Sequence, residues 1–268
     1  MKIRMLLAIS LLWCGNSFSA EHYARFETGG ETYYGRLEGQ VLRQLEGGLF
    51  PLSTLTDKTH RLSEVSLLPP THATKVFAVG KNFASHIASS ARKPPPLFLQ
   101  LPSSLTAHGA KIELPEDARN VHYEGELVLV IGKQARNIPE AEAGDHIFGV
   151  TVGNDLTERS WQRSDLQWAR AKAADGFGPV GPYIAHNLDY TDLLLTTTVN
   201  EKIMQQESVK NMIHSPAKVV SYLSQYFTLE PGDLVFMGTP GKTRALNNGD
   251  VVSVEIEGVG RLTNIITR

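Results

Sequence analysis

Two glutamates, Glu124 and Glu126, lead into an apolar run at 127–131 that is typical of a buried strand. Because side chains alternate between the two faces of a strand, both carboxylates point to the same side. Neighbouring carboxylates repel each other and resist burial, and a bound cation relieves both costs. Asp155 follows a second apolar run at 147–153 and could supply a third oxygen ligand. The three acids are therefore candidate metal ligands, and the alternative is a solvated strand end that binds nothing.

The donor atoms of these acids are all oxygens, which favours a hard divalent cation. The sequence has no histidine or cysteine cluster with zinc spacing. We therefore predict Mg2+, with Mn2+ or Ca2+ as alternatives. Lys172 lies on a predicted helix after Asp155 that is long enough to fold back over the acids. There it would balance their charge and bind an anionic substrate, whereas the alternative is an ordinary solvated lysine.

The elements expected to position these residues are mainly strands. Apolar runs and turn residues predict strands at 75–79, 97–101 and 234–237, and a closing hairpin of 251–256 with 261–266. Helical spacing predicts helices over 157–174 and 216–226. Thr157 is expected to cap the first of them, and Asn82 is expected to cap a short helix at 82–90 that carries His86.

The composition is that of an ordinary globular protein. The chain has 268 residues, of which 41% are hydrophobic and 20% are charged, and its formal net charge is −2. Proteins that bind nucleic acid through its phosphates show a marked excess of Lys and Arg, so we expect no nucleic-acid partner. The length is sufficient for one large domain or two smaller ones, each with its own core.

Residues 1–20 have the pattern of a signal peptide. Lys2 and Arg4 give a positive start, and the apolar run at 5–13 is too short to span a bilayer. Cleavage is expected just after Ser19, and the only cysteine of the chain precedes that point. We predict export to the periplasm and no membrane attachment after cleavage. The alternative is a buried N-terminal helix.

Residues 21–69 are predicted to form a small N-terminal β domain. Short β-prone runs there are separated by glycine pairs such as Gly29-Gly30, and Pro69-Pro70 marks the link to the rest of the chain. No cluster of titratable side chains in this stretch suggests chemistry. We assign the catalytic domain to residues 70–268.

Several stretches of the chain match the motifs of one enzyme family in the right order. They are V-G-K-N-F-A-S-H (79–86), V-H-Y-E-G-E-L (121–127), G-V-T-V-G-N-D-L-T-E-R (149–159), Q-W-A-R-A-K (167–172), G-P-V-G-P-Y (178–183) and L-E-P-G-D-L-V-F-M-G-T-P (229–240). In these motifs the chain resembles the fumarylacetoacetate hydrolase (FAH) family. The resemblance implies an α+β, mainly β fold, with a mixed β-roll or sandwich catalytic domain and a small N-terminal β domain. It also implies a homodimer.

The resemblance assigns roles to individual residues. It places the divalent metal on Glu124, Glu126 and Asp155, the acids already selected by their spacing. Lys172 matches a lysine that contacts the substrate near the metal, and His86 matches a lid histidine that acts as general base. Three further residues match substrate-binding positions: Arg159, Gln162 and Thr239. Of these, Thr239 matches a residue that contacts a substrate carboxylate.

Two positions depart from the family pattern. Ser89 stands where many hydrolytic and decarboxylating members have a glutamate that orients the lid histidine, and Gln100 replaces a usual lysine. The predicted reaction is metal-assisted hydrolysis of a carbon–carbon bond in a β-diketo acid of the acylpyruvate or fumarylpyruvate type. The alternative is isomerisation of a 2-hydroxy-dienoate, such as 2-hydroxyhepta-2,4-diene-1,7-dioate, or decarboxylation of oxaloacetate. A second alternative is an exported protein that binds small carboxylates without catalysis.

Overall fold

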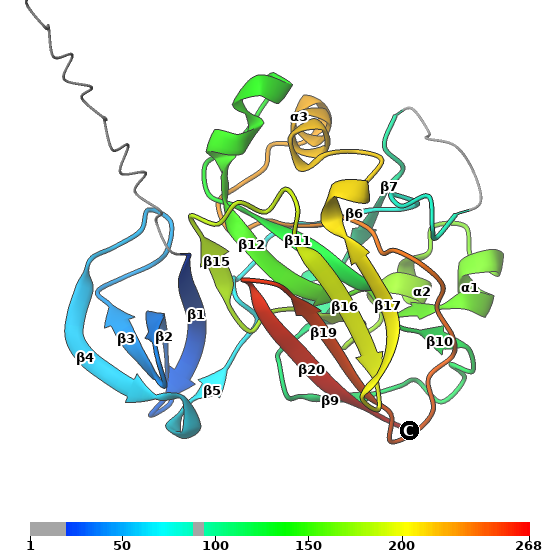
Figure 1. The fold of residues 1–268 in the computed structure, drawn as a ribbon, viewed down its shortest axis with the longest axis horizontal. Coiled ribbons are helices and arrows are strands. Elements are labelled where there is room, and N and C mark those ends of the chain that lie inside the picture. Colours follow the sequence, from blue (N-terminus) through cyan, green and yellow to red (C-terminus); the bar gives the residue numbers. More distant parts are fainter. Residues whose placement is uncertain (1–19, 88–93) are drawn as a thin grey trace, which may run out of the picture.

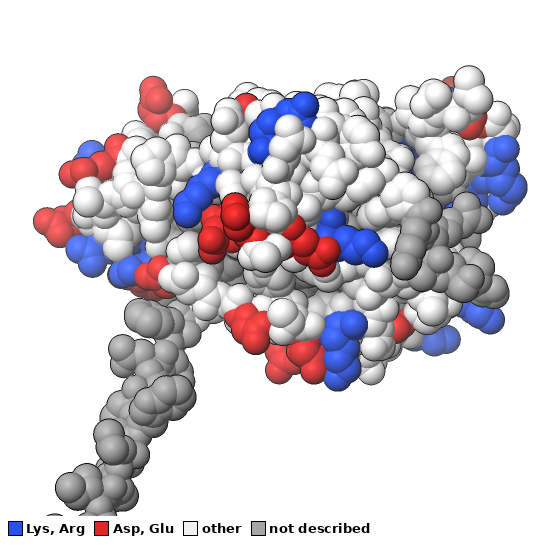
Figure 2. All heavy atoms as spheres, turned by 90° about the horizontal axis from the view of Figure 1, so that it is seen from above, with Lys and Arg blue, Asp and Glu red and all other residues white. Residues whose placement is uncertain are grey.

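The computed structural model describes residues 20–87 and 94–268 (Figure 1). Most of the regular structure is strand, as the sequence predicts, and the strands form two main sheets. No helix within the described ranges combines the length and the apolar character that crossing a membrane requires. On the face shown in Figure 2, acidic and basic side chains are intermixed, which agrees with a net charge near zero.

The N-terminal region is a small antiparallel sheet with one short 3-10 helix. Its elements are β1 (Glu21–Thr28), β2 (Glu31–Glu38), β3 (Val41–Leu45), β4 (Leu55–Arg61), η1 (Leu62–Glu64) and β5 (Ser66–Leu67). Gly29 and Gly30 have φ angles of 60° and 81°, which suits the two-residue turn that joins β1 to β2. Phe26 and Leu42 form a small core of their own between these strands.

This small sheet continues directly into the main sheet, because β1 pairs with β15 in antiparallel register. The strand order is β4-β3-β2-β1-β15-β12-β11-β18-β6-β7, and β5 pairs with β1 outside this path. The strands of the second half are β6 (Val76–Val79), β7 (Leu97–Gln100), β11 (Gly125–Ile131), β12 (Ile147–Asn154), β15 (Ile184–His186) and β18 (Leu234–Phe236). That residues 21–69 form a separate domain stays a prediction.

A second sheet packs against β11 and β12. Its order is β17-β16-β19-β20-β9, with bounds β9 (Lys111–Glu113), β16 (Leu194–Val199), β17 (Lys202–Ser208), β19 (Val251–Ile256) and β20 (Gly260–Thr267). Leu127 and Leu129 face this sheet and share a core with Leu195 and Val254. Because Val128 and its neighbours pack on the opposite face, β11 is buried on both sides, as its apolar run predicts.

Short elements complete the described part of the chain. They are the paired strands β10 (Val121–His122) with β13 (Thr157–Glu158) and β8 (Leu105–Thr106) with β14 (Gly178–Pro179), the 3-10 helices η2 (Pro102–Ser104), η3 (Glu140–His146) and η4 (Val209–Asn211), and the helices α1 (Arg159–Ser164), α2 (Ala169–Ala173) and α3 (Pro216–Tyr226). The predicted helix at 216–226 and the closing hairpin are confirmed. Ser215 caps α3, because its side chain accepts from the backbone N–H of Lys218.

The prediction of one continuous helix over 157–174 is wrong. Thr157 lies in β13 rather than at a helix cap, and Glu158 caps α1 by accepting from the N–H of Trp161. The chain leaves the helix at Asp165 and starts α2 after Trp168, whose φ of 58° is left-handed. The turn between α1 and α2 lets Lys172 point back toward the strands.

The cap expected at Asn82 is also wrong. Its side-chain amide donates to the carbonyl oxygens of His214 and Met237 and accepts from the N–H of His214. These partners are distant in sequence, so the asparagine links β6 to the segment before α3 and to the end of β18. Phe83 forms a β-bridge with Met212, and residues 84–86 form a turn. The rest of the predicted helix after residue 87, including Ser89, lies outside the described residues.

Candidate metal centre and substrate pocket

The pairing of β11 with β12 brings the three candidate ligands together. Gly125 lies opposite Asn154 in this antiparallel pair, and the N–H of Asp155 donates to the carbonyl of Glu124 over 2.8 Å. Asn154 fixes the same corner by accepting from the N–H of Glu124. One carboxylate oxygen from each of the three acids lies within 4.8 Å of the others, and all three residues are buried.

Gly125 permits this approach of the strands. A Cβ atom at this position would lie only 2.1 Å from Thr197 Oγ1 on β16, so no other residue fits while the second sheet keeps its place. The glycine between the two glutamates therefore lets β16 cover the strand just where the carboxylates turn the other way.

Lys172 supplies the first balancing charge. Its Nζ lies 2.6 Å from Glu124 Oε2 and also donates to Asp155 Oδ2. The lysine is buried, and its ammonium stands 4.9 Å above the ring centroid of Phe98. The expectation that the helix after Asp155 folds back over the acids is thus confirmed, although the helix that does so is α2 alone.

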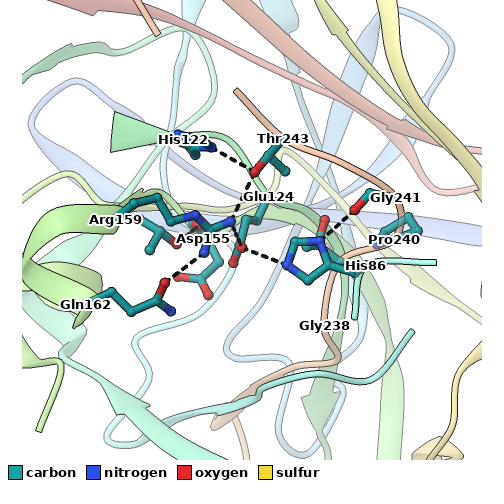
Figure 3. A network of polar contacts seen from close by, with 12 residues as sticks. His86, His122, Glu124, Asp155, Arg159, Gln162, Gly238, Pro240, Gly241 and Thr243 are labelled. Atoms are coloured by element: carbon teal, nitrogen blue, oxygen red, sulfur yellow. Dashed lines mark hydrogen bonds and ion pairs between the residues drawn. The ribbon is translucent and has the colours of Figure 1, made fainter. Parts of the chain in front are cut away.

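Arg159 and Gln162, on α1, flank the acids on another side (Figure 3). Arg159 Nη2 donates to Glu124 Oε1, and its Nη1 donates to Gln162 Oε1 over 2.9 Å. The arginine is therefore positioned by the glutamine and pairs with a candidate metal ligand. Its predicted contact with substrate stays a prediction.

His86 approaches the same glutamate from the opposite direction (Figure 3). Its Nδ1 lies 2.6 Å from the carbonyl oxygen of Gly241, and its Nε2 lies 3.5 Å from Glu124 Oε1. A carbonyl oxygen only accepts, so this contact places the hydrogen on Nδ1 and leaves the lone pair of Nε2 facing the acids. A base in this position can take a proton from a molecule held beside Glu124.

Thr239 lies in the turn that follows β18. Its hydroxyl donates to the carbonyl of Gly125 over 2.8 Å and lies 2.8 Å from the amide nitrogen of Gln205. The hydroxyl hydrogen is thus used within the protein, and its proposed contact with a substrate carboxylate stays a prediction. In the same turn, the N–H of Gly238 donates to Glu126 Oε2 over 2.6 Å and so orients that candidate ligand.

Gln100 contacts the third acid, which motif matching alone did not anticipate. It is buried on β7, and its Nε2 donates to Asp155 Oδ1 over 2.6 Å. Its carbonyl oxygen is buried and has no hydrogen-bond partner among the residues that the structure describes. The available signal was the departure from the family pattern at this position. The neutral amide holds Asp155 without adding a third positive charge.

A second set of residues not predicted from the sequence surrounds Arg159. Thr243 Oγ1 accepts from Arg159 Nη2 over 3.0 Å and lies 2.9 Å from His122 Nδ1. Burial, and then the positive charge of Arg159, lowers the pKa of His122 to about 4. His122, two residues before Glu124 in the sequence, is therefore neutral at physiological pH.

The charges of the site determine which acids are ionised. Burial would raise the pKa of Glu124, but Lys172 and then Arg159 outweigh it and hold that pKa well below its usual range. Burial, and then the negative charges of Asp155 and Glu124, raises the pKa of Glu126 well above its usual range. Burial also raises the pKa of Asp155 to about 7, against the opposing charge of Lys172.

These residues fit a hard divalent cation. When ionised, the three acids outnumber the two cations Lys172 and Arg159, so one negative charge is left uncompensated in a buried place. The raised pKa values of Glu126 and Asp155 show that the charge is unfavourable there without a further cation. Three ionised carboxylates are good ligands for Mg2+, Mn2+ or Ca2+, with water completing the coordination.

A cavity of about 290 Å³ opens over the acids. All eight residues predicted for the site line it: His86, Glu124, Glu126, Asp155, Arg159, Gln162, Lys172 and Thr239. Ile87, Phe98 and Trp168 form an apolar wall, and Arg163 lies on the polar side. The volume and the mixed lining suit a small organic acid.

The comparison with known families agrees with this fold and site. A family model described as Fumarylacetoacetate (FAA) hydrolase C-terminal matches residues 75–267, and one described as Rv2993c-like, N-terminal matches residues 21–70. The chain therefore belongs to the fumarylacetoacetate hydrolase family, as its motifs indicated.

The names of similar proteins refer to more than one reaction. The structure of 5-carboxymethyl-2-hydroxymuconate delta-isomerase from Mycobacterium smegmatis is 37% identical, with a TM-score of 0.88 over 92% of this chain and 99% of that one. A 4-hydroxyphenylacetate degradation bifunctional isomerase/decarboxylase from Escherichia coli is 39% identical over 85% of this chain and 55% of its own length. Fumarylpyruvate hydrolase from Pseudomonas aeruginosa, solved with Mn2+ and pyruvate, is 30% identical, with a TM-score of 0.69 over 79% of this chain and 92% of that one.

Proposed function

We propose that this protein is a divalent-cation-dependent enzyme that converts a short 2-oxo carboxylate, or its enol, through an enolate. We further propose that the reaction is decarboxylation or double-bond isomerisation. The observation that most directly supports this choice over hydrolysis is that the partner of His86 Nδ1 is a neutral backbone carbonyl, that of Gly241, 2.6 Å away. Nε2 of the ring faces Glu124 and the cavity, where it can move a proton in isomerisation.

The charged residues account for binding and for stabilisation of the enolate. A divalent cation on Glu124, Glu126 and Asp155 would supply the chemistry of a Lewis acid, polarising the oxygens of a 2-oxo acid. Lys172 has three N–H donors, of which Glu124 and Asp155 take two. The third remains for an enolate oxygen, whose negative charge would develop beside an ammonium already in place.

The partner of His86 favours reactions that require little of the base. At Nδ1, a neutral carbonyl stabilises a protonated imidazole less than the carboxylate of an orienting glutamate would. The Glu124 carboxylate, 3.5 Å from Nε2, is already paired with Arg159 and Lys172. Hydrolysis requires the ring to remove a proton from water, which is a very weak acid. Isomerisation moves a proton from an enol or an activated carbon, and decarboxylation forms its enolate without removing a proton. At the position of the orienting glutamate, the sequence has Ser89, which lies outside the described residues.

Hydrolysis of an acylpyruvate remains the second candidate, because the P. aeruginosa relative with Mn2+ and pyruvate bears that activity in its name. In this reaction His86 would take a proton from water for attack on the distal carbonyl, and the pyruvate half would leave as an enolate beside Lys172. The two candidates therefore share binding residues and differ in the proton that His86 removes.

Product analysis separates the candidates. Oxaloacetate, a 2-hydroxy-dienoate and an acylpyruvate should each be incubated with the protein and Mg2+ or Mn2+, with a chelator as control. Our proposal predicts chelator-sensitive release of CO2, or a shifted double bond without cleavage. Chelator-sensitive release of two acids from the acylpyruvate alone would favour hydrolysis. Binding without turnover of any substrate would favour a carboxylate-binding protein.

We also propose, from the family resemblance, that the protein is a homodimer. The exposed leucines Leu99, Leu101 and Leu166, on and near the edge strand β7, support the presence of an apolar contact surface. Size-exclusion chromatography with light scattering should give twice the mass of one chain. A mass equal to one chain at micromolar concentration would contradict this proposal.

A further inference from the structure

Two functional side chains converge on a single oxygen atom of the site. Glu124 Oε1 accepts from Arg159 Nη2 and lies 3.5 Å from His86 Nε2 (Figure 3). The separation of the base from the guanidinium is therefore set across one carboxylate oxygen. Neither side chain is held only by its own element, since each has a further partner on the loop after β18.

These further partners are only two residues apart. Gly241 accepts from His86 Nδ1 through its carbonyl, and its N–H donates to the hydroxyl of Ser85 over 3.0 Å. Thr243 accepts from Arg159 Nη2 over 3.0 Å. The stretch 241–243 therefore contacts both the segment that carries the base and the side chain that carries the positive charge.

Hydrogen counting gives this contact a single direction. Arginine only donates, so Thr243 Oγ1 accepts from Arg159. The amide oxygen of Asn120 only accepts, so His122 Nε2 carries the ring hydrogen and donates to Asn120 Oδ1 over 2.9 Å. With one hydrogen on the ring, His122 Nδ1 is the acceptor for the hydroxyl hydrogen of Thr243, 2.9 Å away. The chain of donors runs from Arg159 through Thr243 and His122 to Asn120.

The loop is itself anchored beside this chain of hydrogen bonds. The N–H of Leu246 donates to the carbonyl of Val121 over 2.8 Å, and His122 forms a β-bridge with Ala245. The hydroxyl of Thr243 therefore has a fixed backbone behind it. This matters because a hydrogen bond orients a partner well only when its own position is fixed.

We propose that Thr243 is a positioning residue, which sets the guanidinium of Arg159 against Glu124 through the directed chain Arg159–Thr243–His122–Asn120. Through the stretch 241–243 it also sets the distance between Arg159 and His86. The consequence for substrate binding rests on the proposed function, whereas the hydrogen-bond chain itself does not. The matched substitutions are Thr243→Val, which keeps the shape but loses the hydroxyl, and Thr243→Ser, which keeps the hydroxyl.

The first experiment tests the chain of hydrogen bonds without any substrate. Nitrogen NMR of the metal-free protein distinguishes the two ring nitrogens of His122. We expect the hydrogen on Nε2 in the wild type and in Thr243→Ser, and a change of the His122 nitrogen shifts in Thr243→Val. A hydrogen on Nδ1 in the wild type, or shifts unaffected by Thr243→Val, would overturn the proposal.

The second experiment measures the effect on a ligand. Oxalate is a planar dianion that resembles a pyruvate enolate, and its affinity can be measured by calorimetry with Mn2+ present. We expect Thr243→Val to weaken oxalate binding by about tenfold, the effect of one hydrogen bond to a charged group. Thr243→Ser should restore most of the affinity. Mn2+ binding without oxalate should change less than oxalate binding, because Thr243 acts on Glu124 only through Arg159.

Lys242→Ala is the matched control, since Lys242 is exposed on the same stretch. It should bind oxalate like the wild type. Equal oxalate affinity for Thr243→Val and the wild type, or equal losses in Thr243→Val and Thr243→Ser, would overturn the proposal. A wild-type protein that binds neither Mn2+ nor oxalate would instead contradict the proposed function, and the NMR experiment would still decide the role of Thr243.

Discussion

The ammonium of Lys172 bridges two acids of the triad, lying 2.6 Å from Glu124 Oε2 and donating also to Asp155 Oδ2. A single buried cation thus binds two candidate metal ligands, one just before β11 and one just after β12. The third acid, Glu126, accepts instead from the backbone N–H of Gly238. The charge balance of the site therefore depends on Lys172 when no metal is bound.

Replacing Lys172 should make the metal-free protein unstable in a pH-dependent way. Lys172→Met leaves buried carboxylates without their cation, and breaking a buried pair costs about 3–5 kcal/mol. Urea unfolding at about pH 8 with a chelator should show a loss of this order, and a smaller loss at about pH 5.5, where acids can bind protons. Mg2+ should restore much of the stability.

Lys75→Met is the control for this substitution. Lys75 pairs with Asp233 over 3.0 Å, away from the cavity. Mg2+ should therefore not restore the stability that is lost in Lys75→Met. If Lys172→Met were as stable as the wild type at both pH values, the lysine would not balance the triad.

The pKa values of the triad predict how pH affects stability and metal binding. The pKa of Asp155 is raised to about 7, and that of Glu126 is raised as well. Both are higher in the folded than in the unfolded chain. Their contribution to metal-free stability is therefore fully present at low pH and is lost as pH rises through about 7. Metal ligation requires ionised carboxylates, so the affinity for Mg2+ should rise as pH rises.

Calorimetry with Mg2+ at about pH 6 and about pH 8 measures this dependence, because comparing buffers of different ionisation enthalpy counts the protons released. We expect weaker binding and more released protons at the lower pH. The same affinity at both pH values, without proton release, would show that the acids are already ionised.

Gln100 should affect the metal through Asp155. Gln100→Met keeps the size of the side chain but removes the donor to Asp155 Oδ1, so Mg2+ affinity should fall by about tenfold. Gln44→Met is the matched control, because Gln44 is also buried but binds His60 in the N-terminal region. That variant should lose stability without losing Mg2+ affinity. An unchanged affinity in Gln100→Met would limit Gln100 to a packing role.

Much of the fold follows from periodicity in the sequence. The apolar run at 127–131 predicts a strand buried on both faces. In the structure, one face of this strand packs on the second sheet, and the other shares a core with Tyr23 and Leu45 of the N-terminal region. The triad could be predicted as well, since Glu124 and Glu126 share a face of one strand. Asp155 directly follows β12, which pairs with β11 in antiparallel register.

Other features depend on contacts that the sequence pattern does not contain. The break between α1 and α2 follows from the left-handed Trp168 and from the pairing of Asp165 with Arg170, which a helical pattern does not indicate. Thr243 lies far from Arg159 in sequence, and Gln100 lies far from Asp155. Such pairs meet only after the sheets assemble, so residue type and spacing could not identify them.

The N-terminal segment gives an independent prediction about location. We propose that the protein is exported to the periplasm and that cleavage after Ser19 leaves Ala20 as the first residue. The described residues begin at Ala20, so the structure does not bear on this proposal. Intact-mass spectrometry of protein from the native host should give the mass of residues 20–268. A mature protein that retains Met1 would contradict export by this route.

We propose that Glu124, Glu126 and Asp155 together hold one divalent cation. The most direct test is titration of the chelator-treated protein with Mn2+, followed by electron paramagnetic resonance of the free ion. We predict one bound Mn2+ per chain in the wild type and a loss of at least about a hundredfold in affinity for Glu126→Gln and Asp155→Asn. Both variants should remain folded by circular dichroism. Wild-type protein that binds no Mn2+, or folded variants that bind it as tightly as the wild type, would contradict this account.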